Sequence, residues 1–145
     1  LKPGGTPDLK LWGSFKPEHP RVDLQKSEHK GRTEYRKYEH PAGEERGLFL
    51  FQVPPAMADR LYARHGVEPT TKERRSGFWF IVWRYNLPIT ITEGAKKTLS
   101  SLSQGEITIG LSGVNGGYFA RDGTGAKLER RQLHPELQVF ATPGR

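Results

Sequence analysis

The stretch 88–111 constrains the fold of this chain more than any other part of the sequence. Residues 89–92 predict a short strand, and residues 107–111 predict a second strand because their apolar side chains alternate. Between them, residues 95–104 predict an amphipathic helix that glycines bound at both ends. The expected buried face of this helix comprises Ala95, Leu99 and Leu102. Strands joined through a helix by short connections predict a right-handed β-α-β unit with parallel strands, so the expected fold class is α/β.

The segment just before this unit is ambiguous. Residues 78–85 (FWFIVWRY) are rich in aromatic and β-branched residues, which favours a strand. The flanks favour a helix, because Ser76 can cap its start and Asn86 can take the left-handed conformation after its end. We favour the helix, since residues 88–92 then supply a better strand directly afterwards. The alternative is a hairpin of two strands.

Along the whole chain, composition suggests three segments. Residues 1–47 are polar and rich in Pro, Gly, His and Lys, so we expect an irregular N-terminal region of loops with a few short strands. Residues 48–75 contain an apolar run at 48–53 that predicts a buried strand, then a helix that begins at a double proline, then a charged, turn-like linker. Residues 76–145 hold the β-α-β unit and the C-terminal segment after it.

After the β-α-β unit the pattern is weaker. Residues 118–133 read as two weak strands around the turn signal of residues 122–125 (DGTG). His134-Pro135 can open a short helix that reaches Phe140 or Ala141. We expect the last residues to lead into a further strand that lies outside this chain.

Composition narrows the classes of partner and of chemistry. The formal charge of +7 at pH 7 favours polyanions such as nucleic acid or anionic lipid, although a soluble surface that happens to be basic also explains it. The sequence has no cysteine, which excludes disulfides, thiolate metal sites and a cysteine nucleophile, and a reducing cytoplasmic location fits. The five histidines show no metal-ligand spacing. No apolar run approaches the roughly 18 residues that span a bilayer, so we expect no membrane partner.

Glu93 is the residue that most strongly suggests chemistry. It lies where the first strand ends and Gly94 turns the chain into the helix, which in a parallel sheet is the mouth of the ligand crevice. A carboxylate there can hold Mg²⁺ or act as a general acid or base. Lys96 and Lys97 follow in the first helical turn, where free N–H groups attract phosphates, and Gly94 allows a phosphate to come close. The alternative is that Glu93 only caps the helix.

Other candidate binding residues give weaker signals. The glycine loop of residues 112–117 can present N–H groups to a phosphate, with a plain tight connection as the simpler interpretation. Its candidate residues are Gly116 and Gly117. Several arginines can contact nucleic acid if they line the same mouth as Glu93, and are otherwise solvated. These are Arg74, Arg75 and Arg121, with Arg130 and Arg131 nearby.

Basic and aromatic residues also interleave in the N-terminal segment, at residues 26–40. That arrangement suits backbone contact and base stacking on a single nucleic-acid strand. It suits a polar surface loop equally well, and we favour the loop.

Residues 87–117 (LPITITEGAKKTLSSLSQGEITIGLSGVNGG) resemble the first half of a Toprim domain, the catalytic module shared by primases and topoisomerases. The resemblance lies in a strand that ends in Glu-Gly, an amphipathic helix, a glycine stop and a second strand that runs into a glycine loop. It is closest to a Toprim-like domain of uncharacterised function in large cyanobacterial plasmid and primase-helicase-type proteins, where Glu-Gly precedes a small residue and paired lysines. Further blocks at 12–17, 20–23, 37–41 and 140–145 extend it over most of the chain.

The resemblance implies roles that this chain cannot complete alone. Glu93 would be the catalytic acid/base or a metal ligand, and Lys96 and Lys97 would help to hold phosphates. Toprim catalysis also needs an Asp-x-Asp pair on a later strand, since one carboxylate cannot orient the metal ions. The sequence ends before that strand, and Asp122 is not the missing pair. We therefore expect Mg²⁺ only in a full-length protein.

Two hypotheses of different classes result. The first is a fragment of a plasmid- or phage-type replication protein with an incomplete Toprim-like fold, whose partners would be single-stranded DNA or RNA and possibly a helicase domain. The second is a non-catalytic nucleic-acid-binding module that kept the fold and lacks the metal site. A weaker third possibility is a nucleotide- or small-molecule-binding α/β domain of another family.

Overall fold

The computed structural model describes residues 13–40, 47–122 and 124–141. These residues form two compact units, one made by residues 13–40 and the other by the described residues from Gly47 onwards. Helices and strands follow one another in the larger unit, whereas the smaller unit contains one short helix and isolated β-bridges.

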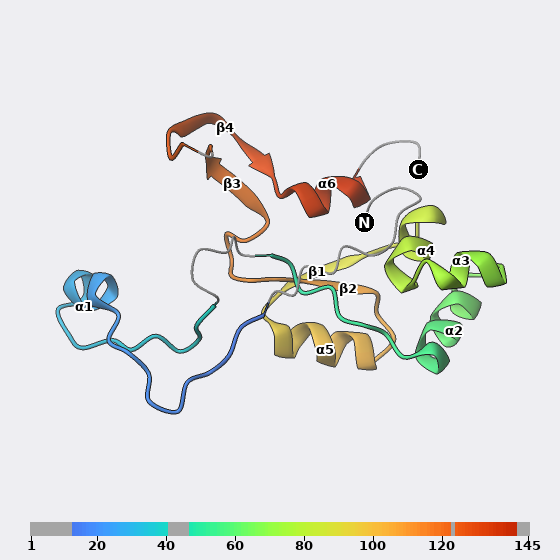
Figure 1. Ribbon diagram of the computed structural model, residues 1–145, viewed down its shortest axis with the longest axis horizontal. Coiled ribbons are helices and arrows are strands. Elements are labelled where there is room, and N and C mark those ends of the chain that lie inside the picture. The colour runs from blue at the N-terminus through green and yellow to red at the C-terminus, as the bar shows by residue number, and fades with distance from the viewer. Residues whose placement is uncertain (1–12, 41–46, 123, 142–145) are drawn as a thin grey trace. The chain divides into compact units, whose positions relative to one another are not determined.

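The larger unit is built on a β-α-β core (Figure 1). Strand β1 (Thr90–Glu93), helix α5 (Ala95–Ser103) and strand β2 (Thr108–Leu111) follow one another through short connections. The strands are parallel, in a register that sets Glu93 opposite Leu111. The expected β-α-β unit and the α/β class are confirmed. Strand β1 ends one residue later than predicted, so Glu93 belongs to the strand itself.

Helix α5 packs closely on one face of the sheet because Gly110 has no side chain. A Cβ at Gly110 would lie 2.2 Å from Oγ1 of Thr98, a fully buried residue of α5. Thr98 donates this hydroxyl to the carbonyl of Gly94 at 2.9 Å. Thr98 and Leu102 are therefore the buried residues of the helix, whereas Leu99 is 49 % exposed. The predicted core position of Leu99 is wrong, because the space above Gly110 turns α5 toward Thr98.

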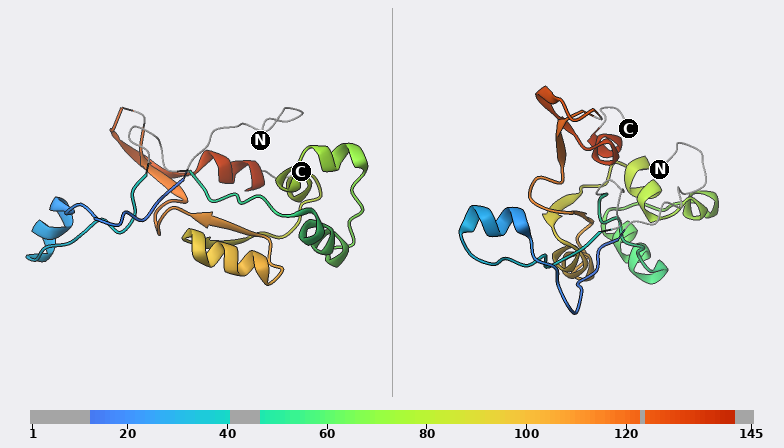
Figure 2. Two further views of the ribbon diagram at one scale, coloured as in Figure 1. Left: turned by 60° about the horizontal axis from the view of Figure 1, so that its bottom comes forward. Right: turned by 60° about the vertical axis from the view of Figure 1, so that its left-hand side comes forward.

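The opposite face of the sheet is covered by helix α6 (Pro135–Ala141), as Figure 2 shows. Ile109 of β2 is fully buried, and Leu137 and Phe140 of α6 belong to the same core. Because side chains alternate along a strand, Ile109 faces α6 while its neighbour Gly110 faces α5. The two helices thus enclose β2 between them.

Residues 48–53 form an extended segment on the other edge of β2. Phe49 and Gly110 make one antiparallel bridge, with N–H to carbonyl distances of 2.8 and 3.2 Å. Leu48 and Val53 are buried. The predicted buried strand is therefore a buried segment that pairs at a single position.

In the described part of the larger unit, three helices precede β1: α2 (Pro55–Arg64), α3 (Thr71–Arg75) and α4 (Phe78–Arg84). The helical interpretation of residues 78–85 is confirmed, and Asn86 adopts a left-handed φ of 51° as expected. The predicted cap is wrong, because Ser76 ends α3 and Gly77 takes the N-cap position of α4.

The predicted turn-like linker is also wrong, because it contains helix α3. Thr70 and Glu73 form a capping box: the Thr70 hydroxyl accepts the Glu73 N–H at 3.3 Å, and the Glu73 carboxylate accepts the Thr70 N–H at 2.8 Å. These bonds satisfy helix N–H groups that otherwise lack partners, so even a five-residue helix can form.

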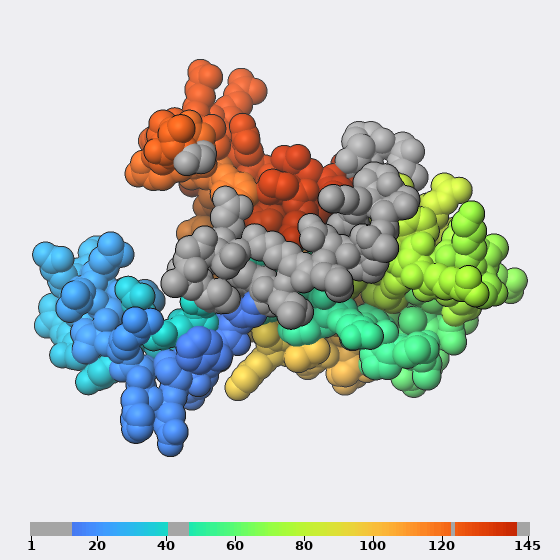
Figure 3. Space-filling view, in the orientation of Figure 1, coloured from blue at the N-terminus to red at the C-terminus, as the bar shows by residue number. Residues whose placement is uncertain are grey.

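Strands β3 (Tyr118–Arg121) and β4 (Lys127–Leu133) form the predicted antiparallel hairpin, which leads into α6. Side chains of this hairpin project into solvent in the space-filling view of Figure 3. Asp122 holds the turn, because its carboxylate accepts hydrogen bonds from the Thr124 hydroxyl at 2.6 Å and the Ala126 N–H at 3.0 Å. These bonds lower the pKa of Asp122.

The smaller unit contains helix α1 (Leu24–Lys30), which the sequence prediction missed, and two antiparallel bridges. Asp23 caps the helix by accepting the Lys26 N–H at 3.2 Å, and Gly31 ends it with a φ of 62°. None of the residues described in 13–40 is buried. Local polar contacts, rather than a core, therefore define this unit.

Candidate functional site

The candidate site lies at the carboxyl end of the parallel strands. Glu93 is the last residue of β1, and the Gly94 N–H donates to the carbonyl of Leu111 in β2 at 2.9 Å. Gly94 has a φ of 84°, which a residue with a side chain rarely adopts, and it turns the chain directly into α5. The Glu93 side chain is exposed. Alternation from Ile91 places it on the sheet face opposite α5.

The carboxylate of Glu93 has no hydrogen bond or ion pair with any residue that the structure describes. In particular, it accepts no N–H of the first turn of α5, so no hydrogen bond supports the alternative that it caps this helix. Lys96 and Lys97 lie in that first turn and are both exposed. Glu93, Gly94, Lys96 and Lys97 thus gather at one end of the sheet.

The glycine loop adjoins the same end, because residues 112–117 directly follow β2. Backbone groups of this loop form hydrogen bonds within the protein. The Gly116 N–H donates to the Gly113 carbonyl at 2.8 Å, and the Gly117 carbonyl accepts the His134 N–H at 2.9 Å. A Cβ at Gly116 would lie 2.9 Å from Oγ of Ser112. The loop is thus a tight turn, and the Gly116 N–H already has a partner that a phosphate would have to displace.

Ser112 has an unusual hydroxyl at the start of this loop. Its Oγ is buried and has no hydrogen-bond partner among the residues that the structure describes. A buried hydroxyl without a partner costs free energy, commonly about 1–3 kcal/mol. Ser112 directly follows Leu111, the residue opposite Glu93, so this cost falls beside the candidate site.

Two of the predicted nucleic-acid-binding arginines, Arg74 and Arg75, lie elsewhere. Both belong to α3, which lies with α4 near the amino end of β1, at the other end of the sheet from Glu93 (Figures 1 and 2). Arg74 forms an ion pair with Asp59, donates to the carbonyl of Pro69 at 3.1 Å and lies 5.4 Å from the ring centre of Tyr62. Its contacts are structural, and it does not line the mouth beside Glu93.

The third predicted arginine, Arg121, lies at the end of β3 and donates to the carbonyl of Gly125 at 2.9 Å within the hairpin turn. A different group of the hairpin lies next to the glycine loop. The Tyr118 hydroxyl donates to the Asn115 side chain at 2.7 Å, and the Arg131 guanidinium lies 4.6 Å from the Tyr118 ring centre. Sequence pattern alone could not predict this contact, because it depends on the register of β3 and β4.

Strand β1 leaves one edge unpaired among the described strands, since it pairs with β2 alone. Beside it runs a mainly apolar groove of about 430 Å³ on the sheet face that α6 covers. The groove is lined by Asn86, Leu87, Pro88, Ile89, Ile91, Ile109, Leu133, Leu137, Phe140 and Ala141. Ile91 is 53 % exposed there, although it belongs to a strand. An unpaired strand edge beside exposed apolar surface is suited to receive another strand.

The Mg²⁺ that we expect in a full-length protein would need ligands besides Glu93. Within residues 13–40, 47–122 and 124–141, no three His, Asp or Glu side chains gather into a group that could hold a metal ion. Mg²⁺ prefers six oxygen ligands in octahedral geometry, usually with one or two carboxylates and bound phosphates. Glu93 alone therefore does not make a metal site. In the same part of the chain, no helix is both long and apolar enough to cross a membrane.

Comparisons with known proteins relate the site to a sequence family of unknown function. Residues 78–145, from α4 onwards, match a family described as a domain of unknown function (DUF3854). The chain is also 36 % identical over 138 residues to an uncharacterised protein of the cyanobacterium Picosynechococcus sp. strain PCC 7002. That alignment covers 93 % of this chain but 13 % of the relative, so the chain spans a small part of the relative's length. No solved structure matches the chain. The region similar to DUF3854 contains β1, α5, β2 and Glu93.

Proposed function

We propose that this chain carries the first half of a Toprim-type phosphoryl-transfer domain of a cytoplasmic replication protein, with Glu93 as general acid/base or metal ligand. One observation carries the proposal: the parallel register of Glu93 and Leu111 puts an exposed carboxylate at the carboxyl end of the sheet. Ligands of open α/β sheets bind in the crevice outside the carboxyl ends of the strands.

The surroundings of Glu93 support chemistry on a phosphate. The free N–H groups at the start of α5 attract anions, and Lys96 and Lys97 add two positive charges in its first turn. Glu93 itself is free of partners among the described residues, so its oxygens are available to a proton or a cation. The Glu93 carboxylate can bind a proton or a cation, and the two lysine ammonium groups can bind phosphates of the same substrate.

The missing part of such a site would come from a further strand. The free edge of β1 lies directly beside Glu93, and a parallel strand there would end at the same rim. An Asp-x-Asp pair at the end of that strand, together with Glu93, would give the cluster of carboxylates that divalent metal ions need. The cyanobacterial relative is several times longer than this chain. We therefore propose the complete activity for a longer protein that contains this chain.

The test is Glu93→Gln in a protein that contains this chain and the sequence that follows Arg145. Primer synthesis and strand cleavage should fall by about 10²–10⁴-fold, as expected for loss of an acid or base. Glu106→Gln is the matched control, because Glu106 is also exposed but lies at the other end of α5, 3.7 Å from Arg64. Unchanged activity of Glu93→Gln would remove Glu93 from the mechanism.

The second candidate is a nucleic-acid-binding module without catalysis. The observation that favours it is that no group of three His, Asp or Glu side chains able to hold a metal ion includes Glu93 among the described residues. The sequence after Arg145 distinguishes the two candidates: an apolar strand that ends in Asp-x-Asp supports the enzyme, and its absence supports the binding module.

A further inference from the structure

The smaller unit exposes an unusual series of aromatic and basic side chains. Residues 35–38 read Tyr-Arg-Lys-Tyr, and all four are exposed, Tyr35 at 54 % and Tyr38 at 49 %. Phe15 is 57 % exposed and forms a β-bridge with Glu39, the next residue along. Its neighbour Lys16 is exposed as well. We call Phe15, Lys16 and residues 35–38 the ring-and-cation surface.

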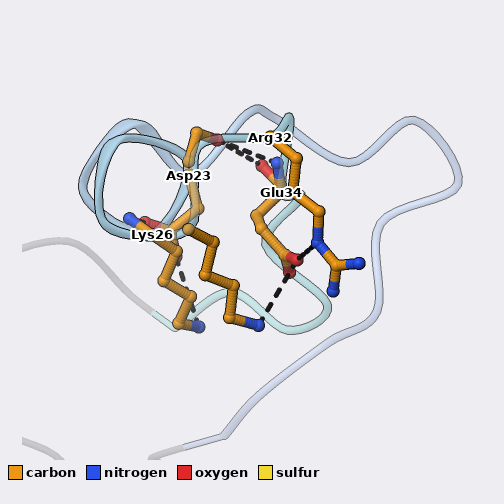
Figure 4. Close-up of polar contacts among 6 residues, drawn as sticks. Asp23, Lys26, Arg32 and Glu34 are labelled. Atoms are coloured by element: carbon orange, nitrogen blue, oxygen red, sulfur yellow. Dashed lines mark hydrogen bonds and ion pairs between the residues drawn. The ribbon is translucent and has the colours of Figure 1, made fainter.

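The acidic residues on either side of residues 35–38 are neutralised within the unit. Glu39 accepts two hydrogen bonds from Arg21, at 2.8 and 2.5 Å. Glu34 accepts one from Arg32 at 2.9 Å and forms an ion pair with Lys30 at 3.3 Å (Figure 4). These partners lower the pKa of both carboxyl groups, so both remain ionised and paired near neutral pH.

The cations of the surface are left without such partners. Lys16, Arg36 and Lys37 make no ion pair within 4 Å in the described part of the chain. The charge of Arg36 nevertheless helps to lower the pKa values of Asp23 and Glu39, whose hydrogen bonds go to Lys26 and Arg21. Residues 35–38 therefore carry two cations and no carboxylate, between two glutamates that already have ion-pair partners. The predicted nucleic-acid-binding residues Arg74 and Arg121 differ in this respect, since internal acceptors already occupy both.

The exposed rings have no core to join, because none of the residues described in 13–40 is buried. Three half-exposed rings in so small a unit present apolar surface to solvent, next in sequence to cations that form no ion pair with the described carboxylates. Single-stranded nucleic acids offer the complementary groups, which are unpaired bases that stack on rings and phosphates that bind cations. Duplex DNA hides its base faces, and an acidic peptide offers no rings to stack.

We propose that the ring-and-cation surface binds single-stranded nucleic acid, with bases on Phe15, Tyr35 and Tyr38 and phosphates on Lys16, Arg36 and Lys37. The choice of nucleic acid as the partner rests on the proposed function. The inference adds to that function the place where the nucleic-acid strand binds. It involves neither Glu93 nor a metal ion. The complex should therefore form in the 145-residue chain itself.

The experiment measures binding of a dye-labelled oligothymidylate to the chain by fluorescence anisotropy, over a series of salt concentrations. Tyr35→Ala with Tyr38→Ala should weaken binding at least about tenfold, since each stacked base contributes about 1–3 kcal/mol. Arg36→Gln with Lys37→Gln should weaken it at low salt and reduce the slope of log affinity against log salt by about 1.4, or about 0.7 per lost phosphate contact.

Three controls separate the surface from general effects. Lys72→Gln with Lys127→Gln removes the same charge from exposed sites of the larger unit and should change affinity less than about twofold, since neither lysine belongs to the ring-and-cation surface. Tyr35→Phe with Tyr38→Phe keeps the rings and should bind like wild type. Glu106→Gln, at an exposed residue outside both proposed sites, should also bind like wild type. The assay needs no catalysis, so failure here is distinguishable from failure of the proposed chemistry.

Several results would overturn the inference. The first is that the oligothymidylate does not bind at low salt. The second is that duplex DNA binds as tightly as the oligothymidylate and the double alanine variant loses no affinity. The third is that polyglutamate competes as well as nucleic acid does, which would identify a general polyanion surface. A loss in the alanine variant counts in favour only if its amide NMR spectrum keeps the signals of α1, because a collapsed unit would lose binding for another reason.

Discussion

Each of the two units of this protein is stabilised internally by different interactions. In the larger unit, α5 and α6 enclose β2, and Ile109 is fully removed from solvent. In the smaller unit nothing described is buried, and a helix cap and exposed ion pairs define the conformation. The first unit presents a carboxylate at the rim of a packed sheet, and the second presents rings and cations on a unit with no buried residue among those described.

This difference has a functional meaning under our proposals. Chemistry on a phosphate needs groups held in place, and pairing of β1 with the buried strand β2 provides that for Glu93. Contact with a flexible single strand tolerates a less rigid surface, because stacking and charge attraction do not depend on exact geometry. The two units should therefore respond differently to mutation, to pH and to salt.

The largest expected effect is the loss of core packing at Ile109. Ile109→Ala should reduce the free energy of unfolding of the larger unit by about 2–5 kcal/mol, because it leaves a cavity between β2 and α6. Urea unfolding followed by tryptophan fluorescence measures this effect, since Trp79 and Trp83 both lie in α4. Amide signals of residues 13–40 should stay in place. A cost below about 1 kcal/mol would contradict the account of the core.

The next effect concerns the close approach of α5 to the sheet. Gly110→Ala should cost about 1–3 kcal/mol in the same urea assay, because the added Cβ would lie 2.2 Å from the Thr98 hydroxyl. Gly113→Ala is the matched control, since a Cβ there meets nothing within 4 Å. Equal stability of the two variants would show that α5 does not pack on Gly110.

A smaller effect separates the units by pH. Hydrogen bonds and nearby cations lower the pKa values of Asp23, Glu34 and Glu39. Groups with lowered pKa values stabilise the folded state fully above their unfolded pKa values, and this contribution disappears as pH falls through the folded values. Amide NMR signals of α1 should therefore shift toward unfolded positions in acid, and more so in high salt. The account fails if the larger unit loses structure first.

The smallest effect is expected at Leu99, which the helical pattern alone would place in the core. Leu99→Ala should change the free energy of unfolding by no more than about 0.5 kcal/mol, as for other exposed positions. Leu102→Ala, at 3 % exposure in the same helix, should cost about 2–5 kcal/mol. Similar costs for both would mean that α5 is rotated from its position here.

Much of the larger unit could be predicted because its signals are local. The β-α-β order follows from short apolar strands around a glycine-bounded helix, and Asn86 marks the end of α4. The position of Leu99 could not be predicted, because the buried face of α5 depends on the space above Gly110, a contact between residues that are distant in sequence. Helix α3 could have been found from Thr70 and Glu73, whose three-residue spacing is the signature of a capping box.

The candidate site was predictable in part for the same reason. The position of Glu93 at the strand end follows from local pattern, and its exposure agrees with that expectation. The ion pair of Arg74 could not be predicted from local pattern, because its partner Asp59 lies fifteen positions earlier in another helix. Helix α1 was not predicted because its segment has low hydrophobicity, although Asp23 and Gly31 are ordinary cap residues at its two ends.

The most direct test of the proposed site is to locate a bound metal ion in a protein that contains this chain and the sequence that follows it. Mn²⁺ can stand in for Mg²⁺ at carboxylate sites and broadens nearby NMR signals. We predict broadening of the methyl groups of Ala95 and Leu111, none at Leu102, and its loss in Glu93→Gln. Broadening centred elsewhere, or unchanged in Glu93→Gln, would contradict a metal site at Glu93.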